Sequence, residues 1–444
     1  MNREDHIVRR PESDVSTATG LVGLGTLLGW LLVCRSWGAI AAALGLPGPR
    51  EPLSGPYAAV LTVLLVGGAM SLWSVLVEKV HRRPSTRIDW SNPRALRDVR
   101  DISTTKIAGL WVTWALIGFF YCIGRWYWDG QYLFAMDVLA LAGPAMAVLV
   151  VPYVLWLDRV MIEPRDASWH FGAMLIGREG YDIEQVKKHW RAWAIKGFFG
   201  AFMISIVPGG FNQVVEADFA ALSGDPVALG VMLTQVLFLI DVQIGTVGYI
   251  FTFRPLDAHI RSGNPLLAGW VAALLCYPPF VWGTIGRGDV LGYEVNAPGW
   301  GYWLHGMPAL EWGWAALLVV LTGIYAWATV IFGLRFSNLT YRGVVTNGPY
   351  RFTRHPAYLS KNLFWWASTL PFLVSSASLT DAVRNTVLLG VVSAIYYWRA
   401  RTEEAHLMAE DAKYRAYYAW MQRNGPITRR LAGLADYLRP KPVA

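Results

Sequence analysis

Two clusters of polar side chains near the C-terminus have the residue types that a binding site for a charged small molecule needs. The first contains Arg351, Arg354 and His355, together with two nearby tyrosines. The second lies at residues 399–404, where the sequence reads Arg-Ala-Arg-Thr-Glu-Glu. Apolar residues separate the clusters. If those residues fold as a helical hairpin, both clusters reach the same face of a membrane and can build one site.

The first cluster is predicted to lie at the start of a helix. Asn347-Gly348-Pro349 has the composition of a turn. Pro356 has its φ angle preset for the first helical turn, which places His355 at the helix cap. The free N–H groups of a helix start favour an anionic group, and the neighbouring Arg and His side chains add hydrogen-bond donors. A carboxylate or phosphate ligand is therefore expected here.

The second cluster is predicted to lie on a helix that emerges from the membrane. Arg399 and Glu403 are four residues apart, and Arg401 and Glu404 are three apart, so each pair shares one helix face. The plain alternative is two exposed salt bridges that contribute only a few tenths of a kcal/mol each. An apolar stripe is expected to dock the following tail helix beside the His355 loop; it consists of Leu407, Tyr414, Tyr418 and Met421.

The elements that must position these clusters are membrane helices. The 444 residues are 54% hydrophobic and only 16% charged, and the mean hydropathy is +0.34, so the chain is too apolar for a soluble protein of this length. We expect an all-α, polytopic transmembrane protein with about ten spans. The spans are expected near residues 17–34, 56–77, 107–123, 132–157, 195–207, 228–252, 265–283, 313–334, 356–375 and 384–398.

The distribution of positive charge predicts the orientation of these spans. With ten spans and a cytoplasmic N-terminus, nearly all of the 39 Lys and Arg residues fall in cytoplasmic segments. Both termini are therefore predicted to be cytoplasmic, and the expected location is a bacterial inner membrane. The net charge of +8 is explained by loops that face an anionic leaflet, without any nucleic-acid partner. The three cysteines lack the spacing of a disulfide framework or a zinc site, so no metal is expected.

The sixth expected span carries two polar residues, Asp241 and Gln243. An aspartate near the middle of the bilayer costs about 2.5 to 3.5 kcal/mol on insertion scales, so it normally faces the protein interior and has a partner. One interpretation is a structural hydrogen bond to a neighbouring helix. The other is that the two side chains line a substrate cavity.

The C-terminal motifs resemble those of the isoprenylcysteine carboxyl methyltransferase superfamily. Gly348-Pro-Tyr, then Arg354-His-Pro-x-Tyr, an apolar hairpin, Arg399-x-x-x-Glu-Glu-x-x-Leu407 and a Tyr-x-x-Tyr follow the pattern of these integral membrane enzymes, to which phospholipid methyltransferases are related. The resemblance covers residues 318–425. It predicts a methyltransferase-like domain at residues 311–444, and leaves a transmembrane region at 1–310 whose role it does not explain.

The resemblance implies specific roles for the motif residues. The cofactor would be S-adenosylmethionine, held at the cytoplasmic face, and Arg354 is a further candidate because it can meet the cofactor's carboxylate. Two residues map onto the catalytic positions beside the acceptor, Arg399 and Glu404. A carboxylate acceptor needs no base, whereas a hydroxyl or amine needs one, with Glu404 or His355 as candidates. The residues that the resemblance assigns to the cofactor are Pro349, Tyr350, His355, Pro356, Tyr358 and Glu403.

The predicted function is methyl transfer to a lipophilic acceptor that enters sideways from the bilayer. The acceptor group can be a carboxylate, a hydroxyl or an amine. Two departures from the family bear on it: the acidic pair is followed by Ala405-His406 instead of a longer acidic run, and Lys361-Asn362 could contact a polar headgroup. The alternatives are a sterol-type reductase that uses NADPH, and a non-enzymatic transporter or lipid-binding scaffold.

Overall fold

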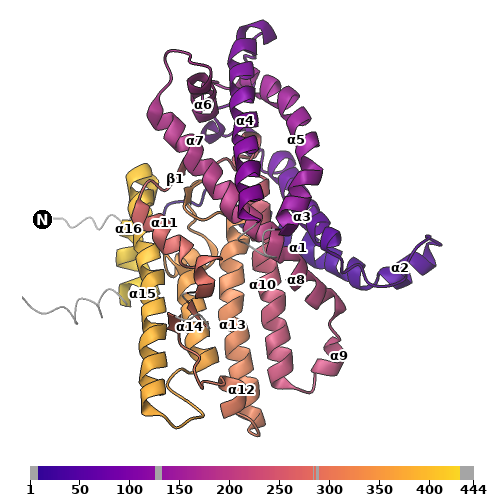
Figure 1. Cartoon of the computed structure of the whole chain (residues 1–444), viewed down its shortest axis with the longest axis vertical. Helices are drawn as coiled ribbons and strands as arrows, with labels where there is room; N and C mark the ends of the chain where they lie inside the picture. The colour runs from indigo at the N-terminus through magenta and orange to yellow at the C-terminus, as the bar shows by residue number, and fades with distance from the viewer. Residues whose placement is uncertain (1–8, 126–132, 284, 287–289, 431–444) are drawn as a thin grey trace, which may run out of the picture.

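The computed structural model describes residues 9–125, 133–283, 285–286 and 290–430, and the regular secondary structure of these residues is almost entirely helical (Figure 1). The two-residue strands β1 (Ser262–Gly263) and β4 (Thr340–Tyr341) pair antiparallel, and β2 (Ile285–Gly286) pairs with β3 (Leu291–Gly292) in parallel. The α-helices are α1 (Thr17–Arg35), α2 (Trp37–Ala43), α3 (Pro56–Leu76), α4 (Leu96–Gly124), α5 (Leu133–Val160), α6 (Ala167–Leu175), α7 (Ile183–Ile195), α8 (Ala201–Glu216), α9 (Phe219–Leu222), α10 (Pro226–Ile250), α11 (Leu267–Leu274), α12 (Trp300–Trp303), α13 (Pro308–Phe332), α14 (Pro356–Thr369), α15 (Leu379–Glu410) and α16 (Ala412–Asn424).

Seven helical segments among the described residues are long and apolar enough to cross a membrane, which confirms an all-α, polytopic architecture. The prediction of ten spans is not supported. Seven of the ten expected segments correspond to these helices, and the seventh, ninth and tenth do not. The chain ends at 1–8 and 431–444, on which the predicted cytoplasmic termini depend, lie outside the described residues. The seven segments are Thr17–Arg35, Pro56–Leu76, Leu96–Gly124, Leu133–Val160, Ile183–Glu216, Pro226–Ile250 and Pro308–Arg335.

The three remaining expected spans differ from a membrane helix in length or in polarity. At 1.5 Å per residue, the eight residues of α11 extend only about 12 Å and the 14 residues of α14 about 21 Å, against about 30 Å of hydrocarbon. Helix α15 has 32 residues and reaches about 48 Å. It is one continuous helix, as predicted, but its C-terminal half is polar and charged.

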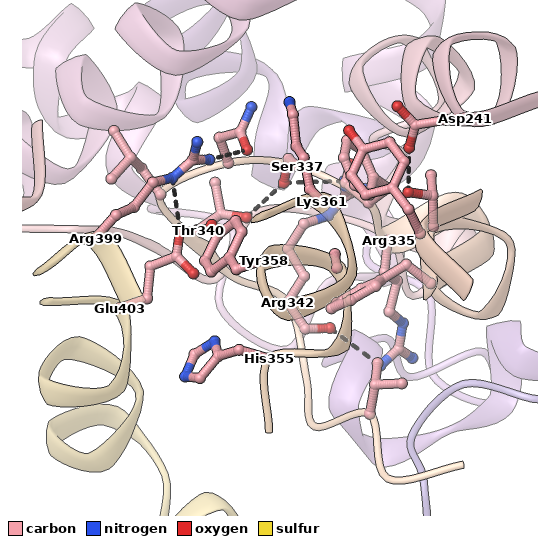
Figure 2. Close-up of a pocket in the computed structure, with 18 of the residues that line it drawn as sticks. Asp241, Arg335, Ser337, Thr340, Arg342, His355, Tyr358, Lys361, Arg399 and Glu403 are labelled. Carbon is pink, nitrogen blue, oxygen red and sulfur yellow. Dashed lines mark hydrogen bonds and ion pairs between the residues drawn. The ribbon is translucent and has the colours of Figure 1, made fainter. Parts of the chain in front are cut away.

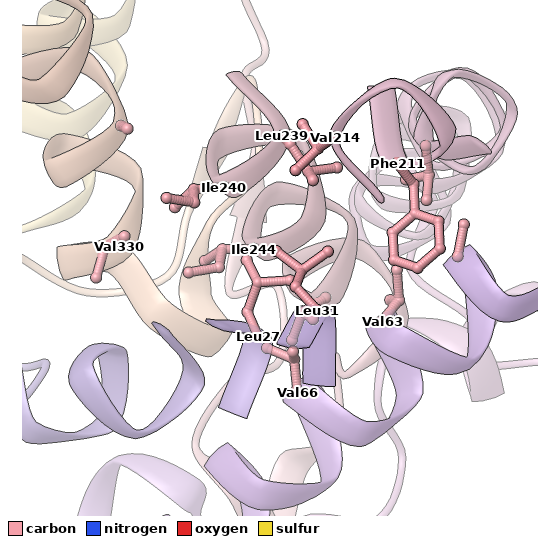
Figure 3. Packing of buried hydrophobic residues seen from close by; sticks show 14 of the residues in the cluster. Leu27, Leu31, Val63, Val66, Phe211, Val214, Leu239, Ile240, Ile244 and Val330 are labelled. Carbon is pink, nitrogen blue, oxygen red and sulfur yellow. The ribbon is translucent and has the colours of Figure 1, made fainter. Parts of the chain in front are cut away.

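The helical core is organised around α10. Its buried face packs against α13, α8 and α3, and α1 completes the cluster (Figure 3). The helix begins where the Asp225 side chain accepts hydrogen bonds from the N–H groups of Val227 and Ala228, and Pro226 occupies the first turn. Ile244 and Val247 are fully buried in this core. Helix α10 is therefore held rigidly, and polar residues on it have defined positions.

The segment that precedes α1 is anchored to the C-terminal region. The Asp14 N–H donates to the Val344 carbonyl, and the Val344 N–H donates to Asp14 Oδ2 at 2.7 Å. The ammonium group of Lys413 on α16 binds Asp14 Oδ1 at 2.5 Å. The start of α1, the loop before α14 and the tail helix therefore lie at the same end of the molecule.

Candidate active site

The loop between α13 and α14 is fixed by a buried arginine. Arg342 is 3% exposed, and its guanidinium donates hydrogen bonds to the carbonyls of Gly248, Phe336 and Leu334 at 2.7–2.8 Å and also to the carbonyl of Ala258. These carbonyls belong to the end of α10, the segment after it and the 3₁₀ turn that follows α13. A guanidinium has five donors in a fixed geometry, so this one side chain joins three parts of the chain beneath the site.

The turn that precedes α14 requires glycine. Gly348 has φ +54°, and a Cβ atom there would lie 2.7 Å from the Ile331 side chain. Residues Gly348–Arg351 form a 3₁₀ turn with Pro349 in its first half. The ring of Tyr350 packs edge-on against Phe332 at 5.3 Å between centroids. The turn thereby directs Tyr350 toward the interior and leaves Pro349 as a buried structural residue.

Helix α14 begins at Pro356 with His355 as its cap, as predicted. The first cluster meets the second across the α14–α15 hairpin. His355 Nε2 lies 3.0 Å from Glu404 Oε1, and Arg354 Nε donates to the same oxygen at 2.6 Å. The hydroxyl of Tyr358 donates to Glu403, and the Tyr358 ring stacks on His355 with 7° between the planes. The hairpin therefore brings the two sequence clusters into contact.

Glu404 is the centre of a buried charge network. It is 1% exposed and also binds Arg401 at 2.5 Å, so it has three cationic or potentially cationic partners. Burial raises the pKa of Glu404, but the hydrogen bond with His355 and the charge and hydrogen bond of Arg354 outweigh that effect and hold this pKa below its usual value. Glu404 is accordingly ionised at neutral pH. The Arg401–Glu404 salt bridge is therefore not a fully exposed pair, because its carboxylate is buried even though the Arg401 side chain is 46% exposed.

Arg399 is buried beside this network and is held on several sides. It is 3% exposed; Nε donates to Glu403 at 3.2 Å, and Nη2 donates to Asn338 Oδ1 at 2.6 Å. Its guanidinium carbon lies 5.0 Å from the ring centre of Tyr358 and 5.6 Å from that of Tyr277. Figure 2 shows Arg399, Glu403, Tyr358 and His355 at one side of a common cavity. Contacts of this kind fix the orientation of a buried arginine.

A single cavity of about 440 Å³ lies between these groups and the membrane helices, within the range of small-molecule sites. Three of the sequence-predicted site residues do not line it: Pro349, Pro356 and Glu404. Glu404 lies behind Arg354 and His355 and orients them. The predicted residues that do line the cavity are Tyr350, Arg354, His355, Tyr358, Arg399 and Glu403.

The cavity continues between α10, α13 and α14 to a second polar group of residues. Asp241 lines it, accepts a hydrogen bond from Thr329 on α13 and interacts with Tyr325. Asp241 thus has the structural partner that the first interpretation expected, and it also faces the cavity. Gln243 does not line the cavity; it is fully buried and lies 3.4 Å from the Ala59 carbonyl. Lys361, on the next turn of α14 after Tyr358, also lines the cavity.

Several lining residues carry no recognisable sequence motif. Asn338 and Tyr277 hold Arg399, and both come from segments without a recognisable motif. His406 lines the cavity and shares a hydrogen bond of 2.9 Å with the hydroxyl of Ser262; burial, together with Arg191, lowers its pKa to about 4. Tyr417 lines the cavity and donates to the Tyr350 carbonyl at 2.6 Å. Tyr417 is the second tyrosine of the Tyr-x-x-Tyr motif, whereas for Asn338, Tyr277 and His406 the aromatic or polar character was the only signal in the sequence.

We predict that the Tyr417 hydroxyl stabilises the docked tail helix. Tyr417→Phe removes one buried hydrogen bond and keeps the ring, so the free energy of unfolding should fall by about 1 kcal/mol. Thermal unfolding of the purified protein in detergent measures the change. Tyr397→Phe on α15 is the control, because Tyr397 is 68% exposed, and it should leave the midpoint unchanged. Equal midpoints for the two variants would contradict the prediction.

Comparison with known proteins bears on the C-terminal part of the chain. Residues 315–409 match the model of the isoprenylcysteine carboxyl methyltransferase (ICMT) family, which confirms the resemblance of the motifs. No curated protein and no solved structure matches the chain. Together with the seven membrane-crossing helices, the match supports a membrane methyltransferase in general terms. It begins inside α13 and ends on α15, so it includes the polar end of the cavity but not α8 or α10.

Proposed function

We propose that the protein is an integral membrane, S-adenosylmethionine-dependent methyltransferase that acts on a lipophilic acceptor at the cytoplasmic face of a bacterial inner membrane. The observation that carries the proposal is the continuity of the cavity. One end is lined by the polar and charged residues Arg354, His355 and Glu403, and the other lies among the apolar helices α8, α10 and α13. A polar methyl donor and a membrane-dissolved acceptor can meet in such a space.

The residues at the polar end fit the proposed cofactor. Arg354 Nη1 is a buried nitrogen with no hydrogen-bond partner among the described residues, although Nε of the same side chain binds Glu404. A buried donor of this kind needs an acceptor, and the carboxylate of S-adenosylmethionine is a matched one. When bound, S-adenosylmethionine supplies a methyl group on a positively charged sulfur for direct transfer. Glu403 and the surrounding tyrosine rings are suited to hold cationic and hydroxyl groups.

The remaining network residues have distinct proposed roles. Arg399 is the residue that would touch and orient the acceptor, since its guanidinium lines the cavity and is fixed by Glu403 and Asn338. Glu404 is a positioning residue, because it binds Arg354 and His355 without lining the cavity. We therefore retain the predicted site residues that line the cavity and assign Glu404 an indirect role. Pro349 and Pro356 do not line the cavity and shape the turn and the start of α14.

The apolar part of the acceptor has a candidate location. A second cavity, of about 630 Å³, shares Gln235 and Phe238 with the first and is lined mainly by apolar and glycine residues of α10, α12, α13 and α14. Apolar cavities at hydrocarbon depth suit aliphatic chains. This supports an acceptor whose reactive group lies in the first cavity and whose tail extends into the second.

Ligand binding to the purified protein tests the proposed cofactor. S-adenosylhomocysteine should raise the thermal unfolding midpoint and NADPH should not, since any ligand that binds the folded state stabilises it. Binding of NADPH instead would favour a reductase. Binding of neither would favour a transporter or scaffold. Either of these two results would contradict the proposal.

Methyl transfer in membranes tests the proposed activity. Membranes that contain the protein should transfer radiolabel from S-adenosylmethionine into a lipid fraction. His355→Ala should lower this incorporation at least tenfold, because it removes a cavity wall and one partner of Glu404. His305→Ala is the matched control, since the His305 side chain is 89% exposed, and it should retain the wild-type rate. Equal labelling by wild type and His355→Ala would count against the assignment.

A further inference from the structure

The inner end of the cavity holds a lysine without a hydrogen-bond acceptor. Among the residues that the structure describes, no hydrogen bond or ion pair involves Lys361 Nζ, although the side chain lines the cavity. The ammonium group lies over three aromatic rings, 5.2 Å from the centre of Trp365, 5.4 Å from that of Tyr325 and 5.7 Å from that of Tyr396. These rings stabilise its charge, but they leave its N–H donors free for a group that enters the cavity.

The same end of the cavity holds a carboxylate with spare acceptor capacity. Asp241 lies on the rigid helix α10 and binds Thr329 through Oδ1. An ionised carboxylate has about four lone-pair sites on its two oxygens. The hydrogen bonds with Thr329 and Tyr325 therefore leave Asp241 able to accept further hydrogen bonds. Ionisable residues at hydrocarbon depth are costly and are typical of functional sites. Both residues line the same cavity, and in the view of Figure 2 the Lys361 side chain is drawn between Arg399 and Asp241.

The two charges interact but do not touch. Each contributes to the electrostatic environment of the other, yet no ion pair between them occurs within the described part of the chain. A ligand group can therefore lie between them. The pair is neutral as a whole, and the charge of Arg399, which also acts on Lys361, is balanced by its ion pair with Glu403. A carboxylate ligand would place a second negative charge beside Asp241, and an alkylammonium ligand would place a second positive charge beside Lys361. A neutral hydroxyl suits both, because it donates to one residue and accepts from the other.

We propose, on the basis of the methyltransferase function proposed above, that Asp241 and Lys361 form the acceptor subsite and that the acceptor group is a lipid hydroxyl. Asp241 is the general base of the reaction, and Lys361 binds the hydroxyl oxygen. This assigns a base that neither His355 nor Glu404 supplies in this geometry: Glu404 does not line the cavity, and His355 Nε2 is engaged with it.

Methyl transfer from S-adenosylmethionine to a lipid hydroxyl needs only Asp241 and Lys361 in addition to the two reactants. The hydroxyl oxygen forms a bond to the methyl carbon, and the bond between that carbon and the sulfonium sulfur breaks with its electron pair left on sulfur. The hydroxyl proton moves to Asp241. The ammonium of Lys361 stabilises the negative charge that develops on the oxygen as the proton leaves. The products are a methyl ether, S-adenosylhomocysteine and protonated Asp241, which later returns its proton to water.

The chemical stability of the labelled product tests the acceptor class. Lipid extracts from membranes incubated with methyl-labelled S-adenosylmethionine are treated with mild alkali. A methyl ether keeps its label, whereas a methyl ester releases it as volatile methanol and a methylated amine keeps it in an acid-extractable, cationic lipid. We expect alkali-stable label in a neutral lipid. Volatile or cationic label, or no lipid label at all in membranes whose protein binds S-adenosylhomocysteine, would overturn the proposal.

Variants test the two residues. Asp241→Asn should lower the transfer rate about a hundredfold and leave the affinity for S-adenosylhomocysteine within about threefold. Its residual rate should rise with pH as hydroxide replaces the missing base, which a purely structural role would not produce. Lys361→Met should lower the rate about a hundredfold with the same unchanged binding.

The control for these variants lies on the same helix. Gln243→Leu changes a buried polar residue that does not line the cavity and should retain the wild-type rate. A wild-type rate in Asp241→Asn would overturn the assignment of the base, as would a residual rate independent of pH. Absence of S-adenosylhomocysteine binding in the wild type is a different result: it would overturn the methyltransferase function itself.

Discussion

Arg399→Met is expected to lower methyl transfer about a thousandfold, the largest effect that we predict for a single substitution. Arg399 is buried and is the common partner of Glu403 on its own helix and Asn338 in the loop before α14. Loss of one pre-organised hydrogen-bond donor at a reacting group costs about 2.7–4 kcal/mol in the transition state, and about 4 kcal/mol corresponds to three orders of magnitude in rate. Methionine keeps the apolar volume between the Tyr277 and Tyr358 rings, so loss of packing contributes little.

The measurement must separate lost chemistry from lost folding. We expect the Arg399→Met protein to retain binding of S-adenosylhomocysteine within about tenfold while transfer falls much further, because Arg399 is proposed to act on the acceptor. Arg384→Met is the matched control: it lies on the same helix α15 but is exposed. Arg384→Met should transfer at the wild-type rate. A parallel loss of binding and transfer in Arg399→Met would instead assign Arg399 to the structure of the site.

The all-α membrane fold could be predicted from the sequence, but the number of spans could not. Helix α11 explains part of the difference between the ten expected spans and the seven found among the described residues. Residues 265–283 are apolar enough to resemble a span, but the helix ends at Leu274, shortly before Pro278 and Pro279. Composition cannot distinguish a short helix packed inside a membrane protein from a crossing helix. Helix α14 also stops early, because Leu370 adopts a left-handed conformation with φ +48° and ends the helix after Thr369.

The site was predictable where its contacts are local. The pairs Arg399–Glu403 and Arg401–Glu404 follow from helical spacing, and both form. The contacts of Glu404 with Arg354 and His355 depended on the proposed hairpin. The role of Asn338 required the tertiary fold, since it lies far in sequence from its partner Arg399. The predicted tail stripe contained Tyr418 but not Tyr417, because helical spacing from Tyr414 allows either residue, and only the tertiary fold shows that Tyr417 is the buried one.

The lining of the cavity indicates a function for the residues that precede the family match. The matched residues 315–409 contribute Arg354, His355 and Arg399, whereas Asp241 comes from α10. Apolar lining also comes from α8. We therefore propose that the region before residue 311 builds the acceptor side of the site. In that case the acceptor of this chain is determined largely by residues that the family match does not include.

Glu404→Gln is expected to lower the free energy of unfolding by about 3 kcal/mol and the affinity for S-adenosylhomocysteine about tenfold. The substitution keeps the shape of the side chain but removes the charge that binds Arg354, Arg401 and His355 in a buried position. Arg354, which lines the cavity, then loses the contact that fixes its guanidinium group. Glu410→Gln on the same helix is the control, because Glu410 is exposed, and it should change neither quantity appreciably.

The same variant should change how stability depends on pH. The pKa of Glu404 in the folded protein is held below its ordinary value of 4.5 by His355 and Arg354, against the effect of burial. A carboxyl group with a lowered pKa stabilises the folded state above its ordinary pKa, and that stability is lost as pH falls through the lowered value. The difference in unfolding midpoint between wild type and Glu404→Gln should thus be full above about pH 5 and shrink at more acidic pH. A difference that stays constant across this range would show that the network does not depend on the charge of Glu404, and the positioning role proposed for it would have to be abandoned.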